Sequence, residues 1–141
     1  MTASPRAVEL AVAAATAAAD KSATDVLALD VSDQLVITDV FVLAAAANDR
    51  QVRAIVDAVE EALSALGVDA VRREGLREAR WVLLDFSLIV VHVQLAEDRQ
   101  YYALERLWKD CPEIALPEEV TRPRSSVEEV ASAGDGQRLG G

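Results

Sequence analysis

The chain has 141 residues, enough for one domain with its own core and too few for two ordinary domains. Its formal net charge of −10 argues against phosphate-backbone binding as the main activity, because nucleic-acid affinity depends largely on lysine and arginine. One cysteine and one histidine provide neither an internal disulfide nor a zinc cluster, and the lack of a long apolar run or a signal peptide predicts a cytoplasmic protein without a membrane span.

A helix is predicted first, running to about Lys21, with Ser4 as its N-cap and Pro5 in its first turn. Four apolar positions share one face of this helix: Val8, Ala11, Val12 and Ala15. Two short segments rich in β-branched residues follow at 25–31 and 38–45, with the polar sequence SDQL between them as a connection. These segments are predicted to be a pair of strands.

The most regular helical pattern lies between Asn48 and Gly67. Gln51 follows Asn48 after three residues, which resembles a capping box, and Gly67 is a typical helix stop. The positions that keep the 3.6-residue period are Val52, Ile55, Val56, Val59, Leu63 and Leu66. Residues 68–74 are then predicted to be a strand with a charged end, and residues 75–80 a polar loop.

Two apolar runs, 81–86 and 89–95, are separated by Ser87-Leu88, which is the spacing of a two-residue β-hairpin. Residues 97–110 carry apolar side chains at helical spacing, and Pro112 ends that helix. The order α, β, β, α, β, β, β, α predicts an α/β fold, a mixed sheet of about five strands with helices packed on it.

The composition changes after Leu116, where aromatic residues disappear and Pro, Ser, Gly and Glu become frequent. Such a segment cannot bury enough apolar area to offset the entropy of ordering it. We therefore expect one domain at 1–116 and a disordered tail at 117–141.

The hairpin spacing predicts which side chains share a face of the sheet. If Phe86 pairs with Ile89, then Leu83 lies opposite His92 and Trp81 opposite Gln94. One face is then apolar core, and the other carries Trp81, Leu83, Asp85, Val90, His92 and Gln94. That second face is typical of a partner-binding surface, although the last helix could also simply cover the tryptophan.

His92, the single histidine, could be a general base, a metal ligand or a structural residue. A nucleophile within reach is not evident, and the chain has no phosphate-binding glycine loop and no Asp-x-Asp pair for two metal ions. The sequence therefore proposes no reaction, catalytic residue, metal or cofactor. A structural or contact role is favoured for His92.

Five segments in order resemble the ribosomal silencing factor family, the RsfS or Iojap-like proteins. They are ALDVSDQLVITDVFVL, NDRQVRAIVDAVEEAL, REG, WVLLDF with VVHV, and DRQYYALERLW. Each motif is modest alone, and together they span about residues 21–108. The resemblance implies a nucleotidyltransferase-like α/β domain without catalytic acids. It further implies a non-enzymatic factor that binds the large ribosomal subunit through ribosomal protein L-fourteen, blocks joining of the small subunit when nutrients are scarce, and forms a homodimer when free.

The family pattern matches at many positions, namely Asp30, Thr38, Asp39, Phe41, Arg50, Gln51, Glu74, Gly75, Trp81, Asp85, His92, Arg99, Tyr102, Leu104, Glu105 and Trp108. Departures occur at Val40, where tyrosine is usual, at residues 44–47, where small polar residues are usual, and at Ser87-Leu88, where Gly-Asp is usual. The expected partner-binding residues are Trp81, Asp85, His92, Arg99, Tyr101, Tyr102 and Glu105. Two alternatives stay open: a diverged nucleotidyltransferase that uses Asp30, Asp39 and Asp85, and a dimeric scaffold with a non-ribosomal partner.

Overall fold

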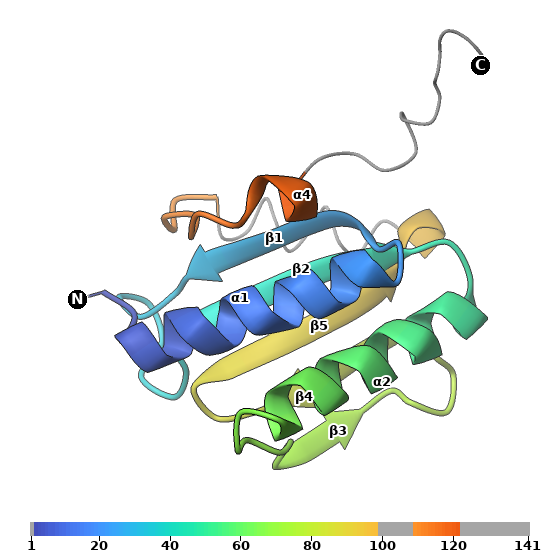
Figure 1. Ribbon diagram of the computed structural model, residues 1–141, viewed down its shortest axis with the longest axis horizontal. Helices are drawn as coiled ribbons and strands as arrows, with labels where there is room; N and C mark the ends of the chain where they lie inside the picture. Colours follow the sequence, from blue (N-terminus) through green and yellow to red (C-terminus); the bar gives the residue numbers. More distant parts are fainter. Residues whose placement is uncertain (1, 99–108, 122–141) are drawn as a thin grey trace, which may run out of the picture.

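Figure 1 shows the computed structural model of the chain, in which residues 2–98 and 109–121 are described. One five-stranded sheet has the order β1-β2-β5-β4-β3. Its strands are β1 (Thr24–Asp30), β2 (Val40–Ala46), β3 (Arg72–Glu74), β4 (Trp81–Asp85) and β5 (Ile89–Leu95). The helices are α1 (Pro5–Asp20), α2 (Asp49–Ser64), the 3-10 turn η1 (Ala96–Asp98) and the short α4 (Glu118–Thr121). Among the described residues, no helix is long and apolar enough to cross a membrane.

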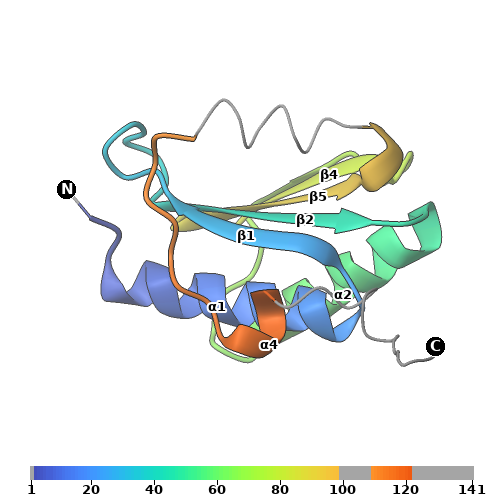
Figure 2. The same ribbon diagram turned by 90° about the horizontal axis from the view of Figure 1, so that it is seen from above.

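The sheet is mixed, as predicted. β1 and β2 are antiparallel, β2 and β5 are parallel, and β4 is antiparallel to both β5 and β3. The parallel pair requires a long crossover, and the chain from β2 to β5 supplies it with α2, β3 and β4. Helices α1 and α2 lie side by side on one face of the sheet (Figure 2). The predicted α/β class is therefore confirmed.

Helix α1 begins as predicted, and two of the four predicted positions, Ala11 and Ala15, meet the core. The Ser4 hydroxyl accepts a hydrogen bond from the Ala7 N–H at 3.1 Å, and Pro5 occupies the first turn. The predicted core positions Val8 and Val12 are only half-buried. The buried stripe is almost entirely alanine, with Ala7, Leu10, Ala11, Ala14, Ala15, Ala17, Ala18 and Ala19. Small side chains let the helix axis approach the sheet closely, which a stripe of valines would prevent.

Helix α2 has both predicted ends. The Asn48 side chain accepts a hydrogen bond from the Gln51 N–H at 2.8 Å, and Gly67 adopts a φ of +85° just beyond the helix. Gln51 also connects the two helices, because its amide group donates to the carbonyl oxygens of Lys21 and Ser22 at 2.9 Å. The start of α2 is thereby attached to the end of α1.

The strand predicted at 68–74 is shorter in the structure, where β3 spans only Arg72–Glu74. The first part of the segment ends the helix instead, since the Val68 N–H donates to the Leu63 carbonyl at 2.9 Å. The three residues of β3 are all exposed, and Arg73 forms an ion pair with Glu60 of α2. This edge of the sheet is therefore short and charged.

The opposite edge of the sheet, at β1, is covered by the chain after residue 109 (Figure 1). The Asp30 N–H donates to the Pro112 carbonyl at 2.8 Å, and the Ile114 N–H donates to the Ala28 carbonyl at 2.9 Å. Helix α4 then places Val120 in the main core. Helix α4 lies within the segment 117–141 that was predicted to be disordered, and it is ordered because Val120 packs against apolar neighbours. The rest of that segment, 122–141, lies outside the described residues.

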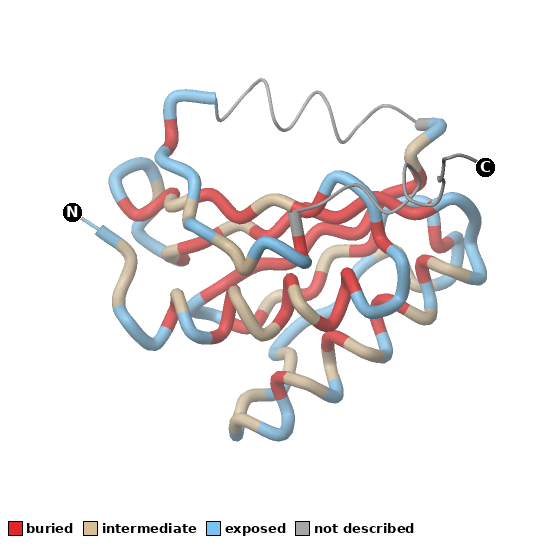
Figure 3. The backbone as a smooth tube through the Cα atoms, turned by 45° about the horizontal axis from the view of Figure 1, so that its top comes forward, coloured by how far each residue is buried: buried red, intermediate tan, exposed pale blue. Residues whose placement is uncertain are grey.

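Two clusters of buried side chains lie on the two faces of the sheet. The main core is between the sheet and the helices, and Figure 3 shows the buried residues following the central strands. The smaller cluster, on the other face, comprises Leu29, Val31, Leu43, Ala45 and Cys111. The second face is therefore partly apolar, and it is the face on which the candidate site lies.

Candidate partner-binding surface

The β4–β5 hairpin has the predicted register. Trp81 pairs with Gln94 and Leu83 with His92, and the Phe86 N–H donates to the Ile89 carbonyl at 2.9 Å. The alternation of the strands then separates the side chains as expected: Val82, Leu84, Phe86, Ile89, Val91 and Val93 belong to the main core. Trp81, Leu83, Asp85, Val90, His92 and Gln94 accordingly lie on the face away from α1 and α2.

The turn of this hairpin forms without the usual glycine. Ser87 has a φ of +76°, a left-handed conformation that L-residues adopt at a cost. A side chain supports it, because the Asp85 carboxylate accepts a hydrogen bond from the Ser87 N–H at 2.8 Å. The two-residue connection assumed from the sequence is therefore present, with strain at its first position.

The accessible part of the face is formed by alternate residues of β4. Trp81 is 38% exposed, while Leu83 and Asp85 are half-buried. Asp85 also lies 3.9 Å from the Arg72 guanidinium, a long ion pair in which the arginine is well exposed. Trp81 is thus partly open to solvent rather than a core residue, and an acid lies two positions beyond Leu83 on the same strand.

His92 holds the Trp81 side chain in place through a hydrogen bond. The Trp81 indole N–H donates to His92 Nδ1 at 3.2 Å, and Phe41 meets the imidazole edge-on with ring centroids 5.1 Å apart. Burial lowers the pKa of His92 from 6.5 to about 4, because a charged imidazole in this position would lack the hydration that it has in water. The ring is therefore neutral near pH 7, with its proton on Nε2 as the accepted hydrogen bond requires.

Two buried polar side chains of β5 have atoms that remain without partners. Within the described residues, neither His92 Nε2 nor either polar atom of the Gln94 amide has a hydrogen-bond partner. Both side chains are buried, and Gln94 is completely so. The described residues place an indole at one nitrogen of this histidine and bond no acid or nucleophile to the other. This geometry supports the structural or contact role predicted for His92.

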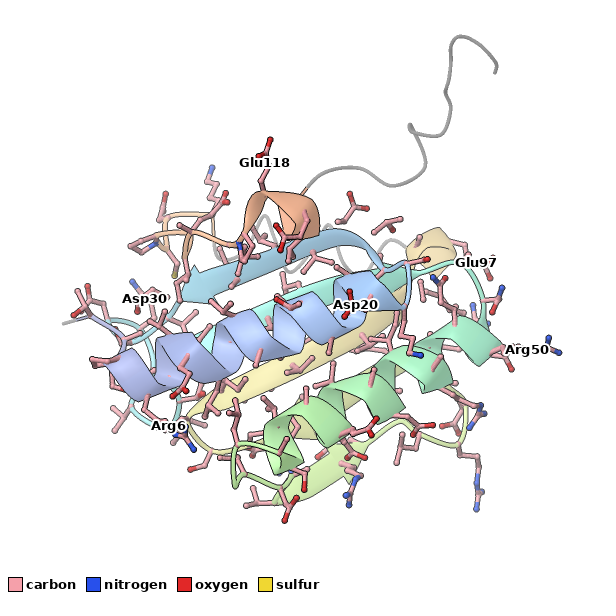
Figure 4. All side chains as sticks on the ribbon, in the orientation of Figure 1. Arg6, Asp20, Asp30, Arg50, Glu97 and Glu118 are labelled. Atoms are coloured by element: carbon pink, nitrogen blue, oxygen red, sulfur yellow. The ribbon has the colours of Figure 1, made fainter. Side chains whose placement is uncertain are left out.

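Of the three acids of the nucleotidyltransferase alternative, Asp30 and Asp39 both lie at the start of α1, whereas Asp85 lies at the hairpin turn. Asp30 lies at the end of β1 beside the start of α1 (Figure 4), where its carboxylate accepts the Ser32 hydroxyl at 2.6 Å and the Ala3 N–H at 2.9 Å. Asp39 accepts the Ser4 N–H at 2.9 Å, whereas Asp85 belongs to the hairpin. The described residues contain no group of three or more His, Cys, Asp or Glu placed to hold a metal ion.

The electrostatics of Asp30 agree with this structural role. Burial raises its pKa, but hydrogen bonds from the Ser32 side chain and from the Ala3 and Ser32 N–H groups outweigh that effect and hold the pKa below the usual value. The carboxylate therefore stays ionised and fixes the backbone that leads into α1.

The remaining predicted contact residues, Arg99, Tyr101, Tyr102 and Glu105, lie outside the described residues. Sequence analysis also missed Val36 and Ile37, which follow the SDQL connection and are exposed in the β1–β2 loop. Apolar residues beside a predicted strand resemble its first residues, and no periodicity signal distinguishes an exposed loop tip from a strand end.

Comparisons with known proteins agree with the motifs of the sequence. The sequence model of a family described as "Ribosomal silencing factor during starvation" matches residues 4–138. A Bacillus subtilis protein named "Ribosomal silencing factor RsfS" is 41% identical over 99 residues, which are 70% of this chain and 84% of that protein. The maize "Protein Iojap, chloroplastic" is 30% identical over 118 residues, 82% of this chain and 50% of that protein.

Two solved structures have the same fold. A crystal structure of a Bacillus halodurans protein superposes with a TM-score of 0.68 at 36% identity, covering 77% of this chain and 98% of its own. A Chromobacterium violaceum protein gives a TM-score of 0.68 at 34% identity, covering 82% of this chain and 95% of its own. The sheet order and the helix placement described above are thus those of a known architecture.

Proposed function

The chain belongs to the family of ribosomal silencing factors, and on that premise we propose that it binds the large ribosomal subunit through ribosomal protein L-fourteen. Once bound, the domain occupies space that the small subunit needs, and this steric block lowers translation when nutrients are scarce. The activity requires no catalytic residue, cofactor or metal. The free protein is proposed to be a homodimer in the cytoplasm.

The observation that carries this proposal is the half-exposed Trp81 on the sheet face away from the helices. An aromatic side chain that is partly open, held by the His92 ring and followed by Leu83 and Asp85 on one strand, has the composition of an interface anchor. Aromatic residues contribute most of the affinity at such surfaces, and nearby charges fix the orientation of the partner.

Charge supports the choice of partner class. The chain carries a net charge of −10, and an acidic surface associates most readily with a basic one. A basic ribosomal protein meets that requirement, whereas an RNA backbone would be repelled by most of this surface. The proposed contact is therefore between proteins, with the partner-binding surface of Trp81, Leu83 and Asp85 at its centre.

The first experiment is co-sedimentation of the purified protein with separated large subunits, small subunits and joined ribosomes, with free ribosomal protein L-fourteen as competitor. We expect binding to the large subunit alone and its loss on addition of the competitor. No binding to any of the particles would contradict the proposal.

Replacement of Trp81 by alanine tests the surface itself. We expect Trp81→Ala to weaken binding by about tenfold or more, which corresponds to roughly 1.4 kcal/mol or more, while the variant still unfolds cooperatively. Val12→Ala is the matched control, because Val12 is a half-buried apolar residue of α1, on the opposite face of the sheet. If Trp81→Ala binds as the wild type does, the interface lies elsewhere on the molecule.

A further inference from the structure

The loop between β1 and β2 has a well-defined backbone. The Val31 N–H donates to the Asp39 carbonyl at 2.9 Å, which closes the loop at its base. The Gln34 and Leu35 N–H groups both donate to the Val31 carbonyl at 2.9 Å, and Leu35 packs on the smaller apolar cluster. The residues that follow are therefore held in place from both ends.

The tip of this loop presents two aliphatic side chains to solvent. Val36 is 100% exposed and Ile37 is 81% exposed. The hairpin turn that carries the exposed Leu88 adjoins this loop, because the Asp39 N–H donates to the Leu88 carbonyl at 3.0 Å. We name Val36, Ile37 and Leu88 the apolar lip. Three exposed aliphatic residues gathered from two turns are typical of a binding surface rather than of scattered surface residues.

The apolar lip continues the partner-binding surface. Figure 2 shows the β1–β2 loop rising on the side of the sheet away from α1 and α2. Strand β4 carries Trp81, Leu83 and Asp85 on that side, and the chain passes from Asp85 into the turn that contains Leu88. A partner seated on the tryptophan and extending along β4 would meet the lip next.

The groups around the lip are mainly acidic. Asp33 lies in the same loop, Asp85 precedes the turn and pairs with Arg72 at 3.9 Å, and Asp110 is exposed beside Lys109 on the segment that begins at residue 109. Burial raises the pKa of Cys111, and the negative charges of Asp110, Asp30 and Asp33 raise it further. The exposed Arg50, by contrast, lies at the other end of the molecule from Asp30 (Figure 4).

The charges around the apolar lip indicate which class of partner can bind there. A second copy seated on the lip would bring its own acids against these acids, and an anionic lipid or RNA surface would be repelled by them as well. A basic protein surface is attracted instead, and its aliphatic side chains can cover the lip.

We propose that the apolar lip is a second contact with the ribosomal partner, which offers it an aliphatic patch flanked by lysine or arginine. This inference rests on the proposed function and adds a part of the surface to it. Trp81 anchors one end of β4 and the lip anchors the other, so the two contacts together fix the orientation of the protein on the large subunit.

The test is a double variant, Val36→Ser with Ile37→Ser, measured by co-sedimentation with large subunits over a range of protein concentrations. We expect at least about tenfold weaker binding with an unchanged melting temperature, because neither side chain is buried in the free protein. The matched control is Val8→Ser with Val12→Ser, which changes two half-buried β-branched side chains on α1, on the opposite face of the sheet, and should bind normally.

Three other outcomes would overturn the inference in distinguishable ways. Normal binding by the double variant, together with weak binding by Trp81→Ala, would remove the lip and leave the proposed function standing. A wild-type protein that binds no large subunit would refute both. If sedimentation velocity shows that the double variant loses a dimer while its ribosome affinity is unchanged, the lip is a contact between copies of this chain.

Discussion

His92 illustrates how a single side chain can be fixed by its surroundings rather than by its own chemistry. It accepts the Trp81 indole N–H, meets the ring of Phe41 and is 6% exposed. Because the imidazole is neutral, Nδ1 is free to accept that hydrogen bond. The orientation of the proposed anchor Trp81 therefore depends on the uncharged state of His92.

The depressed pKa of His92 predicts a loss of stability in mild acid. Between pH 6.5 and about pH 4 the unfolded chain binds a proton at this histidine and the folded chain does not, so the free energy of unfolding falls as pH falls through that window. The full effect amounts to roughly 3 kcal/mol. Urea unfolding of the wild type and of His92→Gln across that range should show a shallower pH dependence for the variant.

Comparison with the variant separates the contribution of His92 to the pH dependence of stability from that of the carboxylates, because the carboxylates titrate in both proteins. Parallel stability profiles for the two proteins would mean that His92 takes up its proton equally in the folded and unfolded states. That outcome would contradict the buried, neutral histidine described above.

At the scale of single elements, the hairpin depends on a turn that its sequence only partly favours. Ser87 stands in a left-handed conformation at the first turn position, supported by the hydrogen bond from its N–H to Asp85. Glycine has no Cβ and adopts this conformation without strain. The hairpin therefore holds Trp81 and Asp85 in register despite the conformational strain at Ser87.

Relief of that strain should stabilise the protein. We expect Ser87→Gly to raise the free energy of unfolding by about 0.5–1 kcal/mol, the left-handed cost minus the extra entropy of glycine in the unfolded chain. Ser87→Ala keeps the strain and should give no gain. Chemical denaturation of the three proteins measures this, and equal stability of all three would show that the turn is not strained.

The elements also show which parts of the fold the sequence could predict. Alternation in residues 81–95 predicted the hairpin register correctly, and Asn48 with Gln51 marked the start of α2, because both patterns depend on neighbouring residues. The core face of α1 was predicted only in part, at Ala11 and Ala15, because a run of alanines offers little hydrophobic contrast between faces. The contact of Asp30 and Asp39 with the backbone of residues 3 and 4 is long-range, and no local pattern indicates it.

At the scale of the whole molecule, the proposed function assigns the approach to the partner to charge and the lifetime of the complex to packing. The chain carries a net charge of −10, whereas the proposed central contacts, Trp81 and the apolar lip, are uncharged. Long-range attraction speeds encounter with a basic protein, and the buried apolar contacts set the dissociation rate.

This division predicts a specific salt dependence. We expect the association rate constant with purified ribosomal protein L-fourteen to fall severalfold between about 0.01 M and about 0.15 M salt, as the Debye length shortens from ~30 Å to ~8 Å. The dissociation rate constant should change little. Stopped-flow or surface-based kinetics measure both, and an association rate independent of salt would argue against electrostatic attraction as the source of partner choice.

The protected edges of the sheet have a consequence for the protein at high concentration. At one edge, the segment that contains Pro112 and Ile114 occupies backbone groups of β1, and at the other, β3 offers three exposed, charged residues. An edge strand with unpaired backbone groups is a template for cross-β growth. In the part of the chain that the structure describes, the covering segment and the short, charged β3 leave few such groups. The described part of the chain therefore presents little free strand edge at which two copies could pair at high concentration.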